Sequence, residues 1–318
     1  EVYMGEVPMM TDSATFITNG VQRVVVNQMH RSPGVFFDHD KGKSHASGKL
    51  LFNCRVIPNR GSWLDFEYDV KDFLYFRIDR KKKILVSSLL MALGFSKSDI
   101  VNEFYQKETF TFNQQTSKWK TKFNPENYKT KNFSEEVTNS KTGKIVIKLG
   151  DKINYITAKK LSNDGLKDIF VTHESLFGKF LHKDIKIDEE QSFKIGTELN
   201  DTILNTITDA KISTIEISTT NSINKGPYLL TTIFNDKNEN KSDAITEIYK
   251  VLRPGEPPTE EIAIKIFNNL FFSSERYDLS DVGRVKMNSR LNLECSDKIT
   301  ILRNDDILAI IQKMLDLR

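Results

Sequence analysis

Two short stretches have residue types that could do phosphate or metal chemistry. Residues 42–44, Gly-Lys-Ser, look like the end of a phosphate-binding loop, but that loop needs glycine at position 37, where the chain has Phe37. Residues 38–40, Asp-His-Asp, look like the start of a calcium loop, but its required glycine and final acid are replaced by Lys43 and Lys49. Both stretches are therefore interpreted as ordinary turns.

Catalytic motifs are absent from the rest of the sequence as well. There is no Gly-x-Ser-x-Gly, no His-Glu-x-x-His and no aspartate triplet of the kind that binds two Mg²⁺ ions. The two cysteines, Cys54 and Cys295, are far apart and predict neither a disulfide framework nor a metal site, which is typical of a reducing cytoplasm. We therefore predict no catalytic residue and no bound metal or cofactor in this chain.

A binding function has better support, at a basic turn followed by a tryptophan. The turn is residues 59–62, Asn-Arg-Gly-Ser, and Trp63 comes directly after it. An aromatic ring beside cations can stack on an unpaired base, which stabilises binding by ~1–3 kcal/mol per base. However, a tryptophan next to an alternating strand is more often a core residue. From the residues alone, the core and the stacking interpretations both stay open.

The segment after Trp63 predicts the elements that would position it. Apolar and polar residues alternate over 64–69, and again over 73–79, with a turn around Asp72 between them. A period of two predicts an antiparallel hairpin with one buried face. The second strand ends in the basic run 80–83, so the ends of the hairpin are expected to face an anionic partner.

Length and composition describe a globular chain rather than a polycation. The 318 residues suggest about two domains, and the hydrophobic fraction of 38% is enough for real cores. The formal net charge is only +3, so any nucleic-acid contact must come from local patches. No apolar run approaches the ~20 residues of a membrane span. We expect a cytoplasmic protein, and a first residue other than Met suggests a fragment of a longer one.

The order of elements predicts an α+β fold with mixed antiparallel sheets and helices. An Asn-Gly pair at 19–20 between apolar strands indicates a hairpin. Residues 106–224 are rich in Lys, Thr, Asn and Ser, and are interpreted as an inserted α+β module. Amphipathic helices are predicted over 242–252 and 303–318, the second with a cap at Asn304 or Asp305.

Several long segments resemble one family closely. They are residues 1–11 (EVYMGEVPMMT), 20–38 (GVQRVVVNQMHRSPGVFFD), 60–67 (RGSWLDFE), 77–83 (RIDRKKK), 253–259 (RPGEPPT) and 269–284 (NLFFSSERYDLSDVGR). They are similar to the β subunit of bacterial DNA-directed RNA polymerase, and the resemblance covers about 1–105 and 225–318 in family order. The middle segment falls where many of these subunits have an inserted domain.

The resemblance implies a domain division and a function. Residues 1–35 would be part of the protrusion domain, 36–105 and 225–318 the lobe, and 106–224 an insertion within it. These domains would form one wall of the DNA channel of a nucleotidyltransferase that synthesises RNA on a DNA template. Another subunit of that complex binds the Mg²⁺ ions, so this chain alone is expected to be non-catalytic. The implied partners are DNA, the β′, α and ω subunits and a sigma factor, in the bacterial nucleoid.

The resemblance also implies roles for individual residues. Trp63 would stack on a non-template base at the downstream edge of the transcription bubble. The other positions expected near DNA are Arg31, Asp79, Arg80, Arg253, Glu256 and Arg284. Three further residues, Arg23, Val26 and Gln28, match one edge of the family's rifamycin pocket. The main rifamycin segment is absent, so weak binding of the drug is expected.

Two alternatives remain for the isolated chain. In the first, it binds single-stranded DNA weakly through Trp63. In the second, it is a structural and interaction module that has no DNA affinity until it is assembled. The low net charge favours the second alternative, because non-specific affinity increases with the number of phosphates neutralised.

Overall fold

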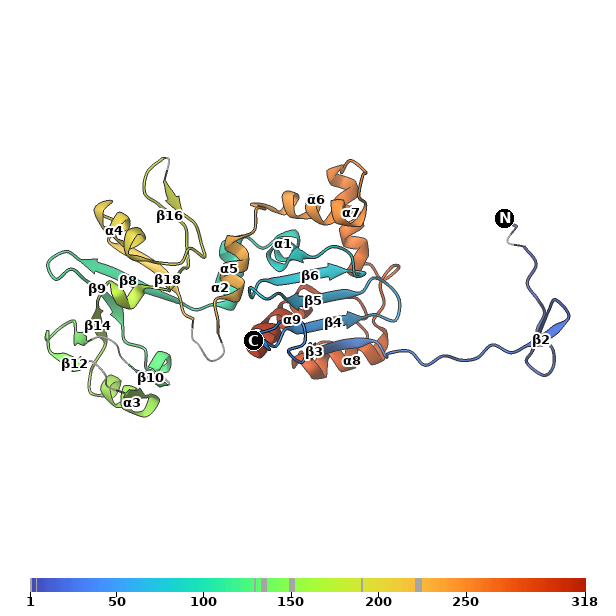
Figure 1. Ribbon diagram of the computed structural model, residues 1–318, viewed down its shortest axis with the longest axis horizontal. Coiled ribbons are helices and arrows are strands. Elements are labelled where there is room, and N and C mark those ends of the chain that lie inside the picture. Colours follow the sequence, from blue (N-terminus) through green and yellow to red (C-terminus); the bar gives the residue numbers. More distant parts are fainter. Residues whose placement is uncertain are drawn as a thin grey trace. The chain divides into compact units, whose positions relative to one another are not determined.

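The computed structural model describes residues 2–3, 5–128, 130–132, 136–148, 152–189, 191–220 and 225–318. The chain divides into two compact units, Glu1–Ser32 and Pro33–Arg318. Its helices and its antiparallel sheets confirm the predicted α+β class (Figure 1). The division into protrusion, lobe and insertion stays a proposal, and its predicted limit at residue 224 lies outside the described residues.

The first unit contains a short hairpin. Strands β1 (Phe16–Thr18) and β2 (Val21–Arg23) pair antiparallel. Asn19 and Gly20 connect them with positive φ angles of 51° and 75°, the conformation that a two-residue hairpin turn requires. The hairpin predicted from the Asn-Gly pair is therefore confirmed.

A five-stranded antiparallel sheet organises the second unit. Its order is β3 (Gly34–His39), β4 (Phe52–Ile57), β5 (Leu64–Tyr68), β6 (Leu74–Ile78) and β7 (Ile84–Leu85). The predicted hairpin is the β5–β6 pair, in which Leu64 lies opposite Ile78 and Phe66 opposite Phe76. All four of these side chains are buried, so the alternation correctly predicted which face is inside.

Local hydrogen bonds explain the turn between β5 and β6. The Asp69 carboxylate accepts the backbone N–H groups of Lys71 and Phe73, at 2.9 Å each. Asp72 has a φ of 65°, a left-handed conformation that Asp and Asn tolerate better than most residues. This turn was expected at Asp72 and is confirmed.

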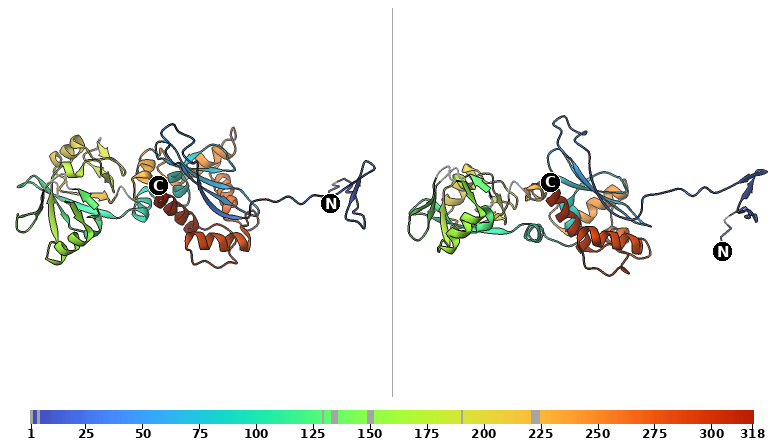
Figure 2. Two further views of the ribbon diagram at one scale, coloured as in Figure 1. Left: turned by 60° about the horizontal axis from the view of Figure 1, so that its bottom comes forward. Right: turned by 90° about the horizontal axis from the view of Figure 1, so that it is seen from below.

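Helices cover the inner face of the five-stranded sheet (Figures 1 and 2). α8 packs on β3, α9 on β4, and α1 and α5 on β6. The helices of this part are α1 (Val86–Ala92), α2 (Lys97–Phe104), α5 (Tyr228–Phe234), α6 (Lys241–Leu252), α7 (Glu260–Phe271), α8 (Ser280–Leu291) and α9 (Asn304–Leu317). Together with the sheet they enclose the largest hydrophobic cluster.

The start of α9 corrects one prediction. Its N-cap is Arg303 rather than Asn304 or Asp305, and the Asp306 carboxylate accepts the Arg303 backbone N–H at 2.8 Å. Asp306 is fully buried, and its carboxylate also neutralises a buried arginine that is described below. The sequence pattern predicts the wrong N-cap because it does not reveal the ion pair between Asp306 and that arginine.

Residues 107–218 build a second, seven-stranded sheet with the order β12-β11-β14-β9-β8-β18-β15. Its strands are β8 (Lys107–Asn113), β9 (Lys118–Lys122), β11 (Val137–Asn139), β12 (Ile145–Ile147), β14 (Asp168–Val171), β15 (Phe180–Leu181) and β18 (Thr214–Ser218). The remaining elements are η1 (Pro125–Tyr128), β10 (Thr130–Asn132), β13 (Lys152–Asn154), α3 (Tyr155–Asn163), η2 (Glu174–Leu176), β16 (Ile185–Lys186), β17 (Ser192–Phe193) and α4 (Asp201–Asp209). Two hydrophobic clusters of its own underlie this sheet.

Candidate nucleic-acid interface

Trp63 lies just before β5, at the end of the β4–β5 connection. Two hydrogen bonds hold its backbone against the end of β6: its N–H donates to Asp79 Oδ1 at 2.8 Å, and its carbonyl accepts the Asp79 N–H at 3.0 Å. The side chain is half-buried, so it is neither a core residue nor a free surface group. The stacking role of Trp63 therefore stays a proposal.

Two arginines flank the indole ring. The guanidinium carbons of Arg55 and Arg80 lie 5.7 and 5.3 Å from its centroid. Both distances are within the ~6 Å range of cation–π attraction. Arg55 is held by an ion pair with Asp65 at 2.6 Å, whereas Arg80 is exposed and follows Asp79 in a left-handed turn. Because Arg80 forms no ion pair among the described residues, its charge is available to an anion.

The turn before Trp63 is anchored to a distant segment. The backbone of Asp278 accepts the N–H groups of Asn59 and Arg60 at 2.8 and 3.0 Å, and its own N–H donates to the Arg60 carbonyl. Gly61 has a φ of +125°, and a Cβ there would lie 2.7 Å from the ring of Tyr277. Only glycine fits this position without displacing Tyr277. These partners are more than 200 positions away along the chain, and sequence reasoning missed them.

Lys81, which follows β6, contacts the end of helix α6. Its Nζ donates to the Leu252 carbonyl, the last residue of α6, at 2.7 Å. Directly afterwards, Arg253 forms an ion pair with Glu256 at 3.1 Å, and the Tyr249 hydroxyl donates to the same carboxylate. Hydrogen bonds from Arg253 and then Tyr249 lower the pKa of Glu256. The predicted residues Arg253 and Glu256 thus follow the helix end that Lys81 contacts.

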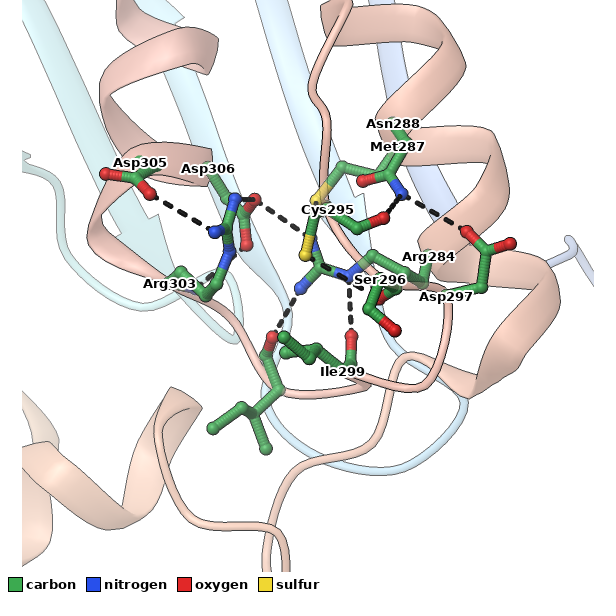
Figure 3. A network of polar contacts seen from close by, with 11 residues as sticks. Arg284, Met287, Asn288, Cys295, Ser296, Asp297, Ile299, Arg303, Asp305 and Asp306 are labelled. Atoms are coloured by element: carbon green, nitrogen blue, oxygen red, sulfur yellow. Dashed lines mark hydrogen bonds and ion pairs between the residues drawn. The ribbon is translucent and has the colours of Figure 1, made fainter.

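Arg284 was expected to face DNA, and the structure corrects that expectation. Its side chain has no exposed surface and forms an ion pair with Asp306, also unexposed, at 2.8 Å (Figure 3). Its other nitrogens donate to the carbonyls of Ile299, at 2.6 Å, and Ile301. Through the ion pair and these two hydrogen bonds, the guanidinium joins α8 to the start of α9. We therefore leave Arg284 out of the proposed DNA contacts.

The remaining predicted residues lie in the first unit. Arg31 is exposed, as are the three residues assigned to the rifamycin-pocket edge, Arg23, Val26 and Gln28. These four residues belong to the first compact unit, whereas Trp63 belongs to the second. Their roles stay predictions from the resemblance.

In the described ranges, no group of three or more His, Cys, Asp or Glu side chains could hold a metal ion. Likewise, the described part of the chain has no helix that is long and apolar enough to cross a membrane.

An aromatic ring flanked by cations can stack on an unpaired base. The family model described as "RNA polymerase Rpb2, domain 2" matches residues 31–162 and 203–318. The chain therefore belongs to the RNA polymerase Rpb2 domain 2 family. The model leaves residues 1–30 and 163–202 unmatched. The second of these stretches lies inside the segment predicted to be an insertion, and the model matches the rest of that segment.

Known relatives agree with this assignment. The chain is 48% identical to the DNA-directed RNA polymerase subunit beta of Rickettsia conorii, and 47% identical to those of Rickettsia felis and Rickettsia prowazekii. Each similarity extends over 100% of this chain and 23% of the relative. The resemblance to a bacterial polymerase β subunit is thereby confirmed, and the chain spans about a quarter of the length of these relatives.

Proposed function

We propose that this chain is a segment of the β subunit of a DNA-directed RNA polymerase and forms one wall of its DNA channel. The family match and the names of the relatives support this proposal. RNA synthesis is the activity of the whole complex, in which another subunit holds Mg²⁺. The chain's partners are then DNA, the β′, α and ω subunits and a sigma factor, in the bacterial cytoplasm.

Within that complex, Trp63 stacks on an unpaired base of the non-template strand, next to the downstream duplex. The observation that supports this proposal most directly is the position of the indole between Arg55 and Arg80, with its backbone held by Asp79. Stacking provides affinity for a base of any identity, and Arg80 supplies a cation for the adjoining phosphate. Arg253 and Glu256, beyond the helix end that Lys81 contacts, would face the same strand, and Arg31 would join it from the first unit.

Fluorescence anisotropy of the 318-residue chain with labelled single-stranded DNA at low salt tests this site. Replacing the indole in Trp63→Ala removes one stacked base, worth ~1–3 kcal/mol, so the Kd should increase by roughly 5- to 150-fold. Trp63→Phe keeps a flat ring and should retain most of the affinity. The matched control is Phe177→Ala, which removes an exposed aromatic ring from the part of the chain that builds the seven-stranded sheet. It should have little effect on the Kd.

An unchanged Kd in Trp63→Ala would refute the stacking role in this chain. If the parent chain itself binds no single-stranded DNA at low salt, the alternative is favoured, in which the chain is a structural module without DNA affinity in isolation. Both outcomes would leave its place in the polymerase family intact.

A further inference from the structure

The two faces of the seven-stranded sheet differ sharply. One face buries Phe110, Trp119 and Ile169 in clusters that include residues of α3 and α4. The strand register places the alternate residues on the opposite face: Lys107, Thr109, Thr111 and Asn113 of β8, Lys118, Lys120 and Lys122 of β9, Asp168 and Phe170 of β14, and Thr214, Glu216 and the buried Ser218 of β18. We call this set the lysine–threonine face.

The lysine–threonine face is open and hollowed. Lys120, Lys122 and the threonines of β8 are exposed. A cleft of about 620 Å³ is lined by residues of β8, β9 and the 123–125 loop, together with Asp168. A sheet face whose side chains already meet water can receive a partner without rearrangement of the core.

Positive charge dominates this face. It has four lysines and two carboxylates, and each carboxylate is paired, in Lys107–Glu216 at 3.1 Å and Lys120–Asp168 at 3.3 Å. Lys118 and Lys122 form no ion pair with any described residue. These two cations are therefore the ones most available to an anionic partner.

The spacing of the lysines has the repeat of a nucleic-acid backbone. Lys118, Lys120 and Lys122 alternate along β9, so their Cα atoms are separated by roughly 6.6–6.8 Å, since a strand rises ~3.3–3.4 Å per residue. Neighbouring phosphates of one strand of B-DNA are farther apart than their axial rise of ~3.4 Å, because the strand also turns about the axis, so this lysine spacing is comparable to one phosphate step. Threonine hydroxyls on the neighbouring strand add donors for phosphate oxygens.

We infer that the lysine–threonine face binds the phosphate backbone of duplex DNA without sequence preference. A protein partner would need apolar or aromatic anchors at the centre of the contact. A single-stranded nucleic acid would need exposed rings on which bases stack. Among the described residues of β8, β9, β14 and β18, the only aromatic on this face is Phe170, and it is half-buried. A regular array of cations fits the duplex backbone better.

Equilibrium binding of the full 318-residue chain to a labelled duplex of about 30 base pairs, at several salt concentrations, tests the inference. In the double variant Lys118→Gln/Lys122→Gln, two phosphate contacts are lost. The slope of log K against log salt should then be shallower by about 1.8, and the affinity at about 50 mM salt should fall at least about tenfold. Equal unfolding midpoints of variant and parent would show that the fold is retained.

The matched control is Lys160→Gln/Lys186→Gln, which removes the same charge from exposed lysines of α3 and β16. It should change neither slope nor affinity by more than about twofold. Equal losses in both double variants, or a parent chain that binds no duplex, would overturn the inference. More effective competition by a polyglutamate peptide than by unlabelled duplex would do the same, by assigning the face to an acidic protein segment. This inference is tested with duplex DNA and the lysine variants, and the stacking site with single-stranded DNA and Trp63→Ala, so failure of one is distinguishable from failure of the other.

Discussion

At the scale of single residues, the ion pair of Arg284 and Asp306 has the largest expected effect on stability. Both side chains are without exposed surface, and two backbone carbonyls complete the guanidinium's hydrogen bonds. Breaking a buried pair by removing one charge typically costs about 3–5 kcal/mol, because the other charge is left buried and uncompensated. The pair therefore holds α8 and the start of α9 together.

Asp306→Asn should lower the free energy of unfolding by about 3–5 kcal/mol, since Arg284 would keep a buried positive charge. Urea unfolding followed by circular dichroism measures the change. Asp305→Asn is the control, because that carboxylate is 66% exposed and should matter by less than ~1 kcal/mol. Similar losses in the two variants would contradict a special role for the buried pair.

Gly61 is the second residue with a large expected effect on stability, because its surroundings leave no room for a side chain. Gly61→Ala should destabilise the chain by clearly more than Gly143→Ala. Both glycines have positive φ, but a Cβ at 61 meets the Tyr277 ring and the Arg276 carbonyl, whereas a Cβ at 143 meets nothing within 4 Å. Thermal unfolding of the two variants compares the clash and the φ of +125° at position 61 with the φ of +66° at position 143, which costs a residue with a side chain ~1–2 kcal/mol. Equal shifts in midpoint would show that Tyr277 moves away at no cost.

His182 gives stability a dependence on pH. Its imidazole is buried, with ring nitrogens 2.9 Å from Ser218 Oγ and 3.0 Å from Asn102 Oδ1. Burial lowers its pKa below 6.5, more than Glu216 raises it, and Lys107 lowers it further. The unfolded chain therefore takes up a proton first as the pH falls through about 6.5, which favours unfolding.

The urea midpoint should accordingly be lower at pH 5.5 than at pH 7.5, and the difference should shrink in His182→Gln, which has no titrating group at this position. Carboxylates with pKa values near or below 4.5 contribute little in this interval, because they stay ionised in both states. An equal pH dependence in parent and variant would exclude His182 as the source.

At the scale of elements, local chemistry was predictable and long-range chemistry was not. The alternation of 64–69 and 73–79 correctly predicted β5, β6 and their buried face, because side chains of a strand point to opposite sides by geometry. The surroundings of Trp63 and the burial of Arg284 depend on segments that meet only in the fold. Nothing in the local sequence distinguishes an arginine that faces DNA from one that a later aspartate neutralises.

The module formed by β8–β18 leaves and rejoins the rest of the unit at adjacent points. The Gln106 carbonyl accepts the Thr219 N–H at 2.8 Å, and the Tyr105 hydroxyl donates to the Gly226 carbonyl at 2.9 Å. A deletion that joins Gln106 to Lys225 through a short Gly-Ser linker should therefore retain cooperative urea unfolding. The midpoint should be lower, because Phe180 and Ile195 belong to the large core cluster. Loss of the cooperative transition would show that the module is an integral part of the fold.

At the scale of the whole molecule, the proposed function makes the chain one segment of a larger complex, without activity of its own. It spans about a quarter of the length of its Rickettsia relatives, and the resemblance assigns Mg²⁺ binding to another subunit. The chain incubated with a primed template, nucleoside triphosphates and Mg²⁺ should therefore incorporate no nucleotide. Reproducible RNA extension, absent from a mock purification, would contradict the prediction.

Two contacts in the second unit join segments that the ribosome synthesises at widely separated times. The Tyr68 hydroxyl donates to the Met314 carbonyl, and Arg318 pairs with Asp72, in both cases across 246 positions. A ribosome that adds ~5–20 residues per second needs roughly 12–50 s to cover that interval. During that time the sheet has left the ribosome without α9, the helix that packs on β4. A nascent chain in this state leaves part of the apolar face of the sheet uncovered.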